Sequence, residues 1–571
     1  MRLKVSKSKN AASLYVIKDI VVDGKRTSKI VEKLGTYDEL LEKLNGQDPF
    51  EWAKQYIEEL NKKEEENKRA VLIPYHPTKF IEKDSQRCFN GGYLFLQQIY
   101  HQLGMHEICK KITEKHSFSY NLDSILSRLI YARIIYPASS KLATHQLSKN
   151  FIEQPDFELQ HVYRALDIIA KETDLIQSQL YKNSLKVSKR NSGVLYYDLT
   201  NYFFEIEQES GLRQYGHSKE HRPNPIVQMG LFMDGDGIPL AFGINPGNTN
   251  EQVTLKPLER KILKDFQLSK FVLCTDGGLA SLENRRFNDL AGRAFITTQS
   301  IKKLKDHLKR WALDPEGWRL SGDNRIYNIS ELDEERYFSH TFYKERWIKE
   351  NGLEQRLIVT YSIRYKDYQN KIRERQINRA LQAVNTNPYK IKKTNPNDYK
   401  RLIKKTNITT EGEVADKEVF SIDQDLIARE AQYDGFYAVC TNLEDDASQI
   451  IRINHRRWEI EECFRIMKNE FKTRPVYLSR DDRIVAHFTT CFLALVVYRF
   501  LEKKLENRFT TSEIIQGLRD MNFFEVRGEG YVPTYTRNDF TDALHDAFGF
   551  RTDYQIMTLR HLKKILKKTK S

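Results

Sequence analysis

The chain has 571 residues, 40% of them hydrophobic, so it is long enough for several folded domains with large cores. A mean hydropathy of −0.63 and a charged fraction of 30% exclude a protein built mainly of membrane-spanning segments. The 92 Lys and Arg outnumber the 78 Asp and Glu and give a formal net charge of +14, which favours a polyanionic partner, nucleic acid first.

The sequence lacks the usual signals for secretion, for membrane insertion, and for zinc or ATP binding. Residues 1–16 carry charge but no apolar signal region, and the longest apolar run, 491–498, is too short to span a bilayer, so we expect a cytoplasmic protein. The six cysteines show no CxxC spacing and are expected to be reduced. No Cys/His zinc spacing and no Gly-Lys-Ser/Thr phosphate loop occurs in the sequence, so neither zinc nor ATP is expected.

The first third of the chain predicts a small β module followed by helices. Residues 13–35 alternate like two strands joined around Asp23-Gly24, which predicts a hairpin. The charged stretch 58–69 is the solvated end of a following helix or a linker. From about 85 to 190 the periodicity is helical, with a break at Pro137. A helical domain of this size is a candidate for reading DNA, although it has no helix-turn-helix signature.

The period then changes to two, which predicts a sheet. Residues 193–205, 226–234 and 238–244 are expected to form three consecutive antiparallel strands, the last two joined by a turn at "DGDG". An amphipathic helix at 252–266 then leads to further strands at 271–278 and 293–300. Three antiparallel strands followed by a helical crossover predict a mixed α/β sheet.

Residues 301–432 are irregular and are interpreted as an insertion. They contain a strand-like stretch at 356–365 and a basic stretch at 389–407, which is either a DNA contact or a solvated linker. A strand at 435–442, a helix at 454–471 and a long amphipathic helix at 483–509 follow.

Three acids stand at sensitive positions of these elements. Asp198 lies inside the first strand, Asp276 closes a later apolar strand, and Glu461 lies on the helix that follows the last strand. Taken singly, each has an ordinary explanation as a strand-end acid, a turn acid and a member of a solvated helix face. Together, converging carboxylates would bind Mg²⁺, and such sites cleave or transfer phosphodiesters. The arrangement therefore indicates a nuclease or strand-transfer centre.

The helix predicted at 454–471 places charged groups beside its own apolar stripe. At 3.6 residues per turn, Arg457, Glu461 and Lys468 share one face. The neighbouring stripe consists of Ile453, Ile460, Phe464, Met467 and Phe471.

These motifs resemble the ribonuclease H-like DDE transposases of bacterial insertion sequences. The resemblance extends to the subgroup with an insertion domain and a signature of Tyr, two residues, Arg, three residues, Glu, six residues and Lys. Arg457, Glu461 and Lys468 match that spacing, and Asn454 stands at the tyrosine position. Further matches are "YYDLTNYFFE", "GHSKEHRPNPIVQMGLFMD", "PGNTNEQVTL", "CTDGGLAS", "RWEIEECFRIMK" and "RPVYLSRDDRIVAHFTTCFLALVVYR".

The resemblance implies a transposase that binds terminal inverted repeats and target DNA and that cleaves and joins strands with Mg²⁺, or with Mn²⁺ as a substitute. It also implies a homodimer in the DNA-bound complex. Asp198, Asp276 and Glu461 are then catalytic metal ligands, and DNA phosphates are bound by Arg457, Lys468, Asn454, His217, Lys219 and Arg222. In relatives, tryptophans of the insertion stack a flipped base; the candidates are Trp311, Trp318 and Trp347, for which core packing is the alternative. Two other functions stay open: a ribonuclease H-like DNA nuclease without joining activity, and a non-catalytic DNA-binding regulator.

The expected fold is α/β, with a ribonuclease H-like mixed sheet of three antiparallel and then parallel strands, a mainly β insertion domain, and helical N-terminal and C-terminal regions. The expected domains are a β-hairpin and helix module (1–75), a helical domain for DNA end binding (76–190), the catalytic core (191–300 and 433–480), the insertion (301–432) and a C-terminal helical region for dimerisation (481–571).

Overall fold

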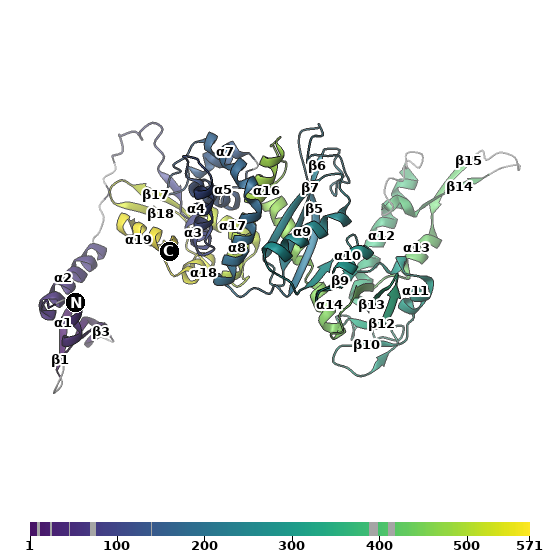
Figure 1. The fold of residues 1–571 in the computed structure, drawn as a ribbon, viewed down its shortest axis with the longest axis horizontal. Coiled ribbons are helices and arrows are strands. Elements are labelled where there is room, and N and C mark those ends of the chain that lie inside the picture. Colours follow the sequence, from purple (N-terminus) through teal and green to yellow (C-terminus); the bar gives the residue numbers. More distant parts are fainter. Residues whose placement is uncertain are drawn as a thin grey trace. The chain divides into compact units, whose positions relative to one another are not determined.

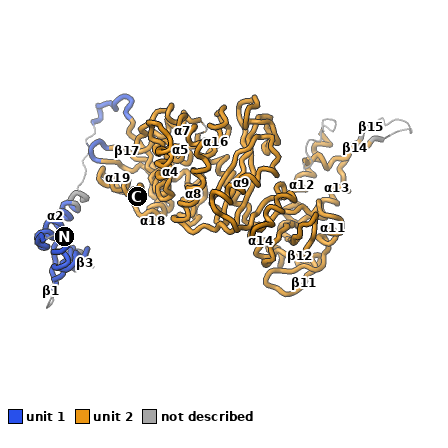
Figure 2. The backbone as a smooth tube through the Cα atoms, viewed as in Figure 1, with its two compact units in different colours: residues 1–85, 526–529 blue, residues 86–525, 530–571 orange. Residues whose placement is uncertain are grey.

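The structure is a computed structural model with two compact units (Figure 2), which are described separately. Unit 1 contains residues 1–85 and 526–529, and unit 2 contains residues 86–525 and 530–571. The described residues are 1–7, 12–22, 25–44, 46–68, 73, 76–138, 140–386, 398–408 and 417–571.

Unit 1 is a three-stranded antiparallel sheet with two helices. The predicted hairpin is present as β2 (Ala12–Val22) and β3 (Lys25–Thr36), and Asp23 and Gly24 lie outside the described residues. A further strand, β1 (Arg2–Lys7), pairs with β2. Helices α1 (Tyr37–Lys43) and α2 (Pro49–Lys68) follow, and Leu14, Leu40 and Ala53 form the small core.

Unit 2 is organised around one ten-stranded sheet with the order β11-β10-β12-β13-β16-β9-β8-β5-β6-β7. The three predicted antiparallel strands are β5 (Val194–Phe203), β6 (Ile226–Asp234) and β7 (Pro239–Pro246). Strands β8 (Val272–Thr275) and β9 (Ala294–Thr298) then continue parallel to β5. The predicted mixed α/β sheet is therefore confirmed (Figure 1).

The two faces of this sheet are covered by different helices, because alternate side chains of β5 point to opposite sides. Leu195, Tyr197 and Leu199 pack in a cluster with side chains of α9 (Glu251–Asp265). Tyr196 and Tyr202 belong to the main core, which also contains α16 (Asp481–Lys504). Helix α16 is long and apolar enough to cross a bilayer, but 94% of its apolar window is buried inside the protein, which makes it the central core helix.

The insertion differs from the mainly β domain that the sequence predicts. Its strands β12 (Phe342–Glu350) and β13 (Leu353–Tyr361) extend the central sheet through β16 (Phe436–Thr441), which is antiparallel to β9. Its longest element is a helix, α12 (Ile363–Thr386). The remaining described elements of the insertion are η1 (Ile301–Lys303), α11 (Asp306–Leu313), β10 (Trp318–Leu320), β11 (Ile326–Tyr327), η3 (Tyr399–Leu402), β14 (Ile403–Ile408), β15 (Lys417–Ile422) and α13 (Gln424–Ala431), and α10 (Leu282–Phe287) precedes it, between β8 and β9. Residues 389–397 of the basic stretch lie outside the described residues.

The helical region before the sheet and the C-terminal region form one core around α16 (Figure 1). The first region contributes α3 (Tyr93–Gln102), α4 (Met105–Lys115), α5 (Leu122–Ile135), α6 (Lys141–Ser148), α7 (Leu159–Lys171) and α8 (Thr173–Val187). The second contributes α17 (Thr511–Asp520), α18 (Asp539–Phe548) and α19 (Leu559–Thr569). Neither is purely helical, because β4 (Cys88–Asn90), β17 (Asn522–Val526), β18 (Gly530–Pro533) and β19 (Met557–Thr558) form a four-stranded sheet. The side chains that join the two regions are apolar, so the interface between them is part of the core.

Candidate active site

Two of the predicted acids lie side by side, Asp198 within β5 and Asp276 directly after the neighbouring parallel strand β8. The register pairs Tyr197 of β5 with Thr275 of β8, so Asp198 and Asp276 are the next residues on each strand. Neighbouring strands lie about 4.8 Å apart, which places the two backbones side by side. Alternation puts Asp198 on the same face as Tyr196, whose hydroxyl donates a hydrogen bond of 2.8 Å to the Ile453 carbonyl. Asp198 therefore lies on the face of the sheet that contacts the helix of residues 447–455, which precedes the helix of Glu461.

The helix predicted at 454–471 is three pieces. Helix α14 (Ala447–His455) ends before Arg456, α15 (Trp458–Arg465) starts after Arg457, and a π-helical turn, η4 (Ile466–Glu470), follows directly. Asn454 and Glu461 are therefore on different helices. The apolar stripe is buried as predicted, with Ile460, Phe464, Met467 and Phe471 all in the core. The π-turn changes the direction of Lys468 relative to Glu461, because its hydrogen bonds span five residues instead of four.

Arg457 is the residue that connects all three acids. Its Nη2 lies 3.3 Å from Glu461 Oε1. Burial lowers the pKa of the guanidinium, but the oxygen groups around it outweigh that effect and leave the pKa raised. These groups are the phenol of Tyr437 and the carboxylates of Asp198, Glu461 and Asp276. One cation thus neutralises part of the negative charge of three carboxylates.

Asp198 is the most desolvated of the three acids, at 9% exposed. Burial raises the pKa of its carboxyl to about 6, and the nearby Asp276 adds to the shift. Lys219 and Arg457 oppose it, together with the hydrogen bond of 2.8 Å that the Leu199 N–H donates to Asp198 Oδ1. Burial is thus the main reason that the charged form of Asp198 is disfavoured.

Glu461 stands apart from the two aspartates. Its side chain is 57% exposed and is turned toward Arg457. The described residues contain one group of at least three acid, His or Cys ligand atoms within 4.8 Å of one another, and that group is Asp542, His545 and Asp553. Arg551 already pairs with both aspartates of that group at 2.7 Å, so its charge is satisfied. The three predicted acids are thus neighbours through Arg457 without direct carboxylate contact.

A fourth carboxylate lies beside Asp276 that the sequence did not single out. Glu251 begins α9, and its Oε2 lies 3.6 Å from the point where a Cβ on Gly278 would stand. Both carboxylate oxygens of Asp276 lie 3.4 Å from the same point. Lys219 Nζ is 4.0 Å from Glu251 Oε1 and donates a 2.5 Å hydrogen bond to the Leu199 carbonyl. The matching segment "PGNTNEQVTL" contained this acid, but only the fold places it near Asp276.

Asn454 is nearly buried. It is 6% exposed, and its Nδ2 donates a hydrogen bond of 3.2 Å to the Tyr437 hydroxyl. That hydroxyl also lies 2.6 Å from Thr298 Oγ1, and the Cys274 thiol donates to Asn454 Oδ1 at 3.7 Å. Asn454 thus joins α14 to β8 and β16. It also lines a cleft that Arg457 and Glu461 share, and the phosphate contact expected of it stays a prediction.

The predicted basic residues of the loop 205–225 are distributed unevenly. His217 is exposed, and Lys219 lies near Asp198. The Arg222 guanidinium stacks over the Phe203 ring at 4.2 Å. Lys468 is only 13% exposed and pairs with Glu220 of the same loop at 3.4 Å. The loop is held in place by its close approach to the next loop, since a Cβ on Gly216 would lie 2.0 Å from the Gly247 carbonyl oxygen.

A cleft of about 600 Å³ opens beside Arg457 and Glu461, toward the insertion. It is lined by polar and aromatic side chains, among them Tyr365, Tyr368 and the exposed Trp458. Flat aromatic rings next to cations are suited to nucleic acid, whose bases stack and whose phosphates pair with positive charge. Of the tryptophans considered from the sequence, Trp318 is fully buried, Trp311 is half-buried and Trp347 is 45% exposed.

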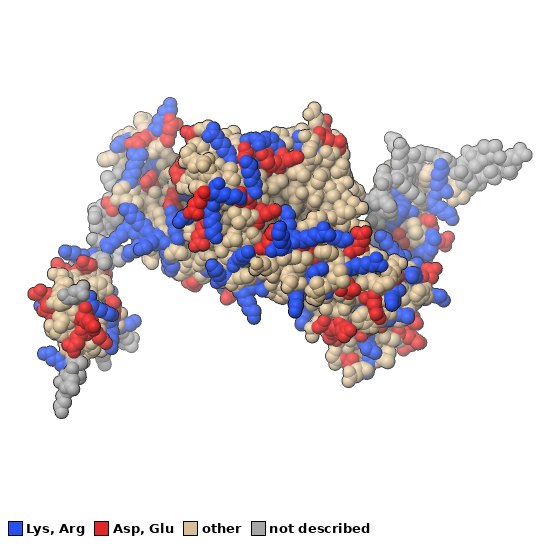
Figure 3. All heavy atoms as spheres, in the orientation of Figure 1, with Lys and Arg blue, Asp and Glu red and all other residues tan. Residues whose placement is uncertain are grey.

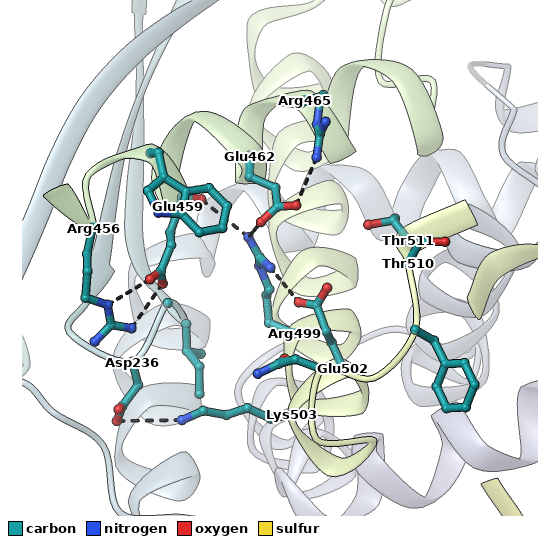
Figure 4. Close-up of a pocket in the computed structure, with 15 residues that line it drawn as sticks. Asp236, Arg456, Glu459, Glu462, Arg465, Arg499, Glu502, Lys503, Thr510 and Thr511 are labelled. Carbon is teal, nitrogen blue, oxygen red and sulfur yellow. Dashed lines mark hydrogen bonds and ion pairs between the residues drawn. The ribbon is translucent and has the colours of Figure 1, made fainter. Parts of the chain in front are cut away.

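The opposite side of α15 is fixed by a network of ion pairs (Figure 4). This second pocket, of about 430 Å³, is lined by both signs of charge. Arg499 of α16 reaches Glu462 at 3.3 Å, and Arg456 pairs with Glu459 at 2.8 Å. Lys503 lies 3.6 Å from Asp236 in the turn between β6 and β7. These pairs hold the helix that carries Glu461 against α16 and the sheet. Elsewhere, Lys and Arg side chains extend over the visible face of unit 2 with acids among them (Figure 3).

Comparison with known proteins gives one family match. Residues 353–497 match the model of the Transposase DDE domain, a range that includes Arg457, Glu461 and Lys468. The solved structures that match include "Cryo-EM structure of piggyBac transposase synaptic complex with hairpin DNA", with 8% sequence identity over 85% of this chain and 88% of that chain and a TM-score of 0.35. A search of curated proteins found no match. The chain therefore contains a region similar to a DDE transposase domain.

Proposed function

We propose that this chain is an insertion-sequence transposase that binds terminal inverted repeats and catalyses metal-dependent DNA cleavage and strand transfer. The observation that carries the proposal is the grouping of Asp198, Asp276 and Glu461 around Arg457. The match of residues 353–497 to a transposase DDE domain supports it independently. The assignment to the bacterial subgroup with an insertion domain is part of the proposal and rests on the spacing of Arg457, Glu461 and Lys468.

The sheet supports a ribonuclease H-like core. The strands β7, β6, β5, β8 and β9 lie in that order, with β6 antiparallel to both of its neighbours and β5, β8 and β9 parallel. In this set β5, the first strand in the sequence, lies at the centre and pairs with β8, the fourth strand in the sequence. This order brings the acid of β5 beside the acid that follows β8, although 78 residues separate Asp198 from Asp276 (276 − 198) in the sequence.

The residues present fit a divalent metal ion. Carboxylate oxygens are the hard donors that Mg²⁺ prefers, and both carboxylate oxygens of Asp276 and one of Glu251 lie within 3.6 Å of one point above Gly278. Asp198, Asp276 and Glu461 would hold Mg²⁺, with Mn²⁺ as a substitute. When bound, the metal would supply Lewis-acid polarisation of a phosphoryl oxygen.

The protein's own side chains would position the DNA. Arg457 offers a planar guanidinium suited to a phosphate between the acids and the cleft. Lys219 supplies a second cation beside Asp198. The cleft of about 600 Å³ has room for a nucleotide next to Glu461. If Glu461 bound the metal, it would leave Arg457, and the Arg457 guanidinium would then be available to bind a DNA phosphate.

The proposed reaction consists of two displacements at phosphorus. In the first, water forms a P–O bond and the bond to the 3′-oxygen breaks, which leaves a 3′-hydroxyl. In the second, that hydroxyl forms a P–O bond with another strand and loses its proton, while the bond to the original oxygen of that strand breaks. The number of phosphodiester bonds falls by one in the first step and is unchanged in the second.

A homodimer on DNA is part of the proposal. The C-terminal region expected to mediate it contributes α16 to the core, which leaves α17, α18 and α19 as the helices that could make the contact. Helix α19 buries Leu562 and Ile565 and exposes its lysines. Light scattering of the purified complex with one and two DNA ends would give the stoichiometry.

One assay tests the function. Purified protein is mixed with labelled DNA that carries the sequences flanking the gene, with Mg²⁺ or with EDTA, and the products are separated by gel electrophoresis. We expect nicked and joined products with Mg²⁺ only, and none from Asp198→Asn, Asp276→Asn or Glu461→Gln, which should still bind DNA. Cleavage without joining would indicate a nuclease instead, and binding without cleavage would indicate a regulator.

A further inference from the structure

Three cations converge on one carboxylate at the end of β5. Glu220 Oε1 lies 3.4 Å from Lys468 Nζ and contacts Arg474, and its Oε2 lies 4.0 Å from Arg222 Nε. Glu220 is 23% exposed and Arg474 is 21% exposed, so this is a half-buried cluster. The carboxylate of Glu220 thus lies among Arg222, Lys468 and Arg474, which we call the cradle. These three cations come from separate segments of the chain: the loop 205–225, η4 and the residues after η4.

The floor of the cradle is aromatic and belongs to the strand that carries Asp198. Lys468 Nζ lies 5.4 Å from the centre of the Tyr202 ring. Arg222 and Arg474 lie over the Phe203 ring at 4.2 and 5.9 Å. Tyr202 is four residues beyond Asp198 on β5, a distance of roughly 13 Å along an extended strand. The cradle is therefore within a few nucleotides of the acids.

The cradle contains more positive charge than Glu220 can neutralise. Burial lowers the pKa of Lys468 to about 8, and Lys219 nearby contributes to that shift, while Asp198 opposes it. Burial also lowers the pKa of Arg474. A backbone phosphodiester carries the same single negative charge as Glu220, but its two non-bridging oxygens can each accept from the guanidinium and ammonium groups that already meet at this point.

The loop that holds Glu220 is under local strain. His221 has a φ of 54°, a left-handed conformation that residues with a side chain rarely adopt. The Ser218 hydroxyl accepts hydrogen bonds from the N–H groups of Glu220 and Arg222, each at 3.3 Å, and these stabilise the turn. A strained turn of this kind favours a segment with a second conformation.

We propose that Arg222, Lys468 and Arg474 form a binding site for one phosphate of the DNA backbone and that Glu220 occupies this site in the DNA-free protein. The inference rests on the proposed function only in taking DNA as the source of the phosphate. Binding exchanges the carboxylate for the phosphate, so Glu220 lowers the affinity for DNA in general. In the DNA-free protein, a phosphate can bind these three cations only by displacing the Glu220 carboxylate. Glu220 therefore weakens non-specific binding of DNA most strongly.

The test measures binding to a fluorescent duplex of arbitrary sequence by anisotropy, in EDTA and at several salt concentrations. Glu220→Gln should bind about fivefold tighter, equivalent to roughly 1 kcal/mol for one half-exposed charge contact. Arg474→Gln should bind more weakly and reduce the slope of log K against log salt by about 0.9. In the double variant, the gain from Glu220→Gln should largely vanish, because the cradle is already broken.

Glu207→Gln is the matched control. Glu207 is an exposed acid of the same loop, and no ion pair to it is seen among the described residues, so its removal changes net charge alone. Its effect on affinity should be small and should be the same with or without Arg474→Gln. Equal effects of Glu207→Gln and Glu220→Gln, or a gain from Glu220→Gln that persists in the Arg474→Gln background, would overturn the proposal.

A second measurement uses the unmodified protein, so it still tests the proposal if a variant fails to fold. Amide hydrogen exchange of residues 217–222 should become faster when DNA binds, because Glu220 leaves its cations and the turn opens. Unchanged or slower exchange there would contradict the exchange of anions. Since neither assay involves cleavage, a protein that binds in this way but does not cut DNA would disprove the transposase and leave the phosphate site in place.

Discussion

Arg457 Nη2 lies 3.3 Å from Glu461 Oε1, and Asp198 and Asp276 lie close enough to help raise the pKa of the same guanidinium. The arginine thus occupies the position of an internal counter-ion at the acidic site. Glu461 is held by it and remains more than half exposed. A metal ion and this arginine therefore compete for the same negative charge.

Replacing that arginine should strengthen metal binding. Removal of one cation beside the carboxylates in Arg457→Gln is expected to tighten Mn²⁺ binding about tenfold, a partly screened Coulomb effect of roughly 1.4 kcal/mol. Electron paramagnetic resonance titration of free Mn²⁺ measures this. Cleavage should nevertheless fall, because a phosphate contact is lost. Arg465→Gln, which removes an exposed cation of the same helix paired with Glu462, should leave the Mn²⁺ affinity unchanged. An equal effect of both variants would rule out the counter-ion role.

The stability of the metal-free protein should depend on Asp198 and pH. Its folded pKa of about 6 lies above the ordinary value of 3.8, so the stability from this group is present below pH 3.8 and is lost as the pH rises through 6. A shift of about two units corresponds to about 3 kcal/mol. Asp198→Asn should therefore stabilise the protein at pH 8 by up to that amount, with a gain that shrinks toward pH 4. Thermal unfolding in EDTA at both pH values measures it, and a gain independent of pH would contradict the assignment.

Asn454 should act on stability and not on DNA. Its amide lies inside the protein and donates to the Tyr437 hydroxyl. Asn454→Ala should lower the free energy of unfolding by about 1–3 kcal/mol, because buried partners lose their hydrogen bonds. The salt dependence of DNA binding should stay unchanged, whereas Lys468→Gln should reduce its slope by about 0.9. A reduced slope in Asn454→Ala would restore the phosphate contact that the resemblance implies.

The buried pair of Arg190 and Asp234 should be a major determinant of folding. Arg190 Nε donates to Asp234 Oδ2 at 2.6 Å, and the two side chains are 1% and 0% exposed. Asp234→Ala leaves a buried guanidinium without its partner, which should cost about 3–5 kcal/mol. Denaturant unfolding measures this loss. The exposed pair of Lys261 and Asp174 offers a control, since Asp174→Ala should cost under about 1 kcal/mol.

Local pattern in the sequence was enough to predict the strands and much of the candidate site. Apolar and polar residues alternate in 193–205, 226–234 and 238–244, and this pattern depends only on neighbouring residues. The strands β5, β6 and β7 therefore lie where they were expected. The position of an acid at a strand end is also local. Asp198 and Asp276 could therefore be singled out before their side-by-side register was known.

Other features depend on contacts between distant segments, which periodicity does not contain. The insertion was expected to be a separate, mainly β domain. Its strands β12 and β13 instead join the central sheet through β16, because an unpaired edge strand offers backbone hydrogen bonds to a neighbouring strand. The pattern of 454–471 fits one helix, yet it is broken at residues 456 and 457.

The sequence by itself determined the strands β5, β6 and β7, their order and the positions of the acids, because each is set by residues a few positions apart. Only the tertiary structure decided which charged groups meet: Arg457 with three carboxylates, Glu251 with Asp276, and Glu220 with Lys468. The physical reason is that a buried or half-buried charge takes the nearest opposite charge in space, and nearness in space is a property of the folded chain.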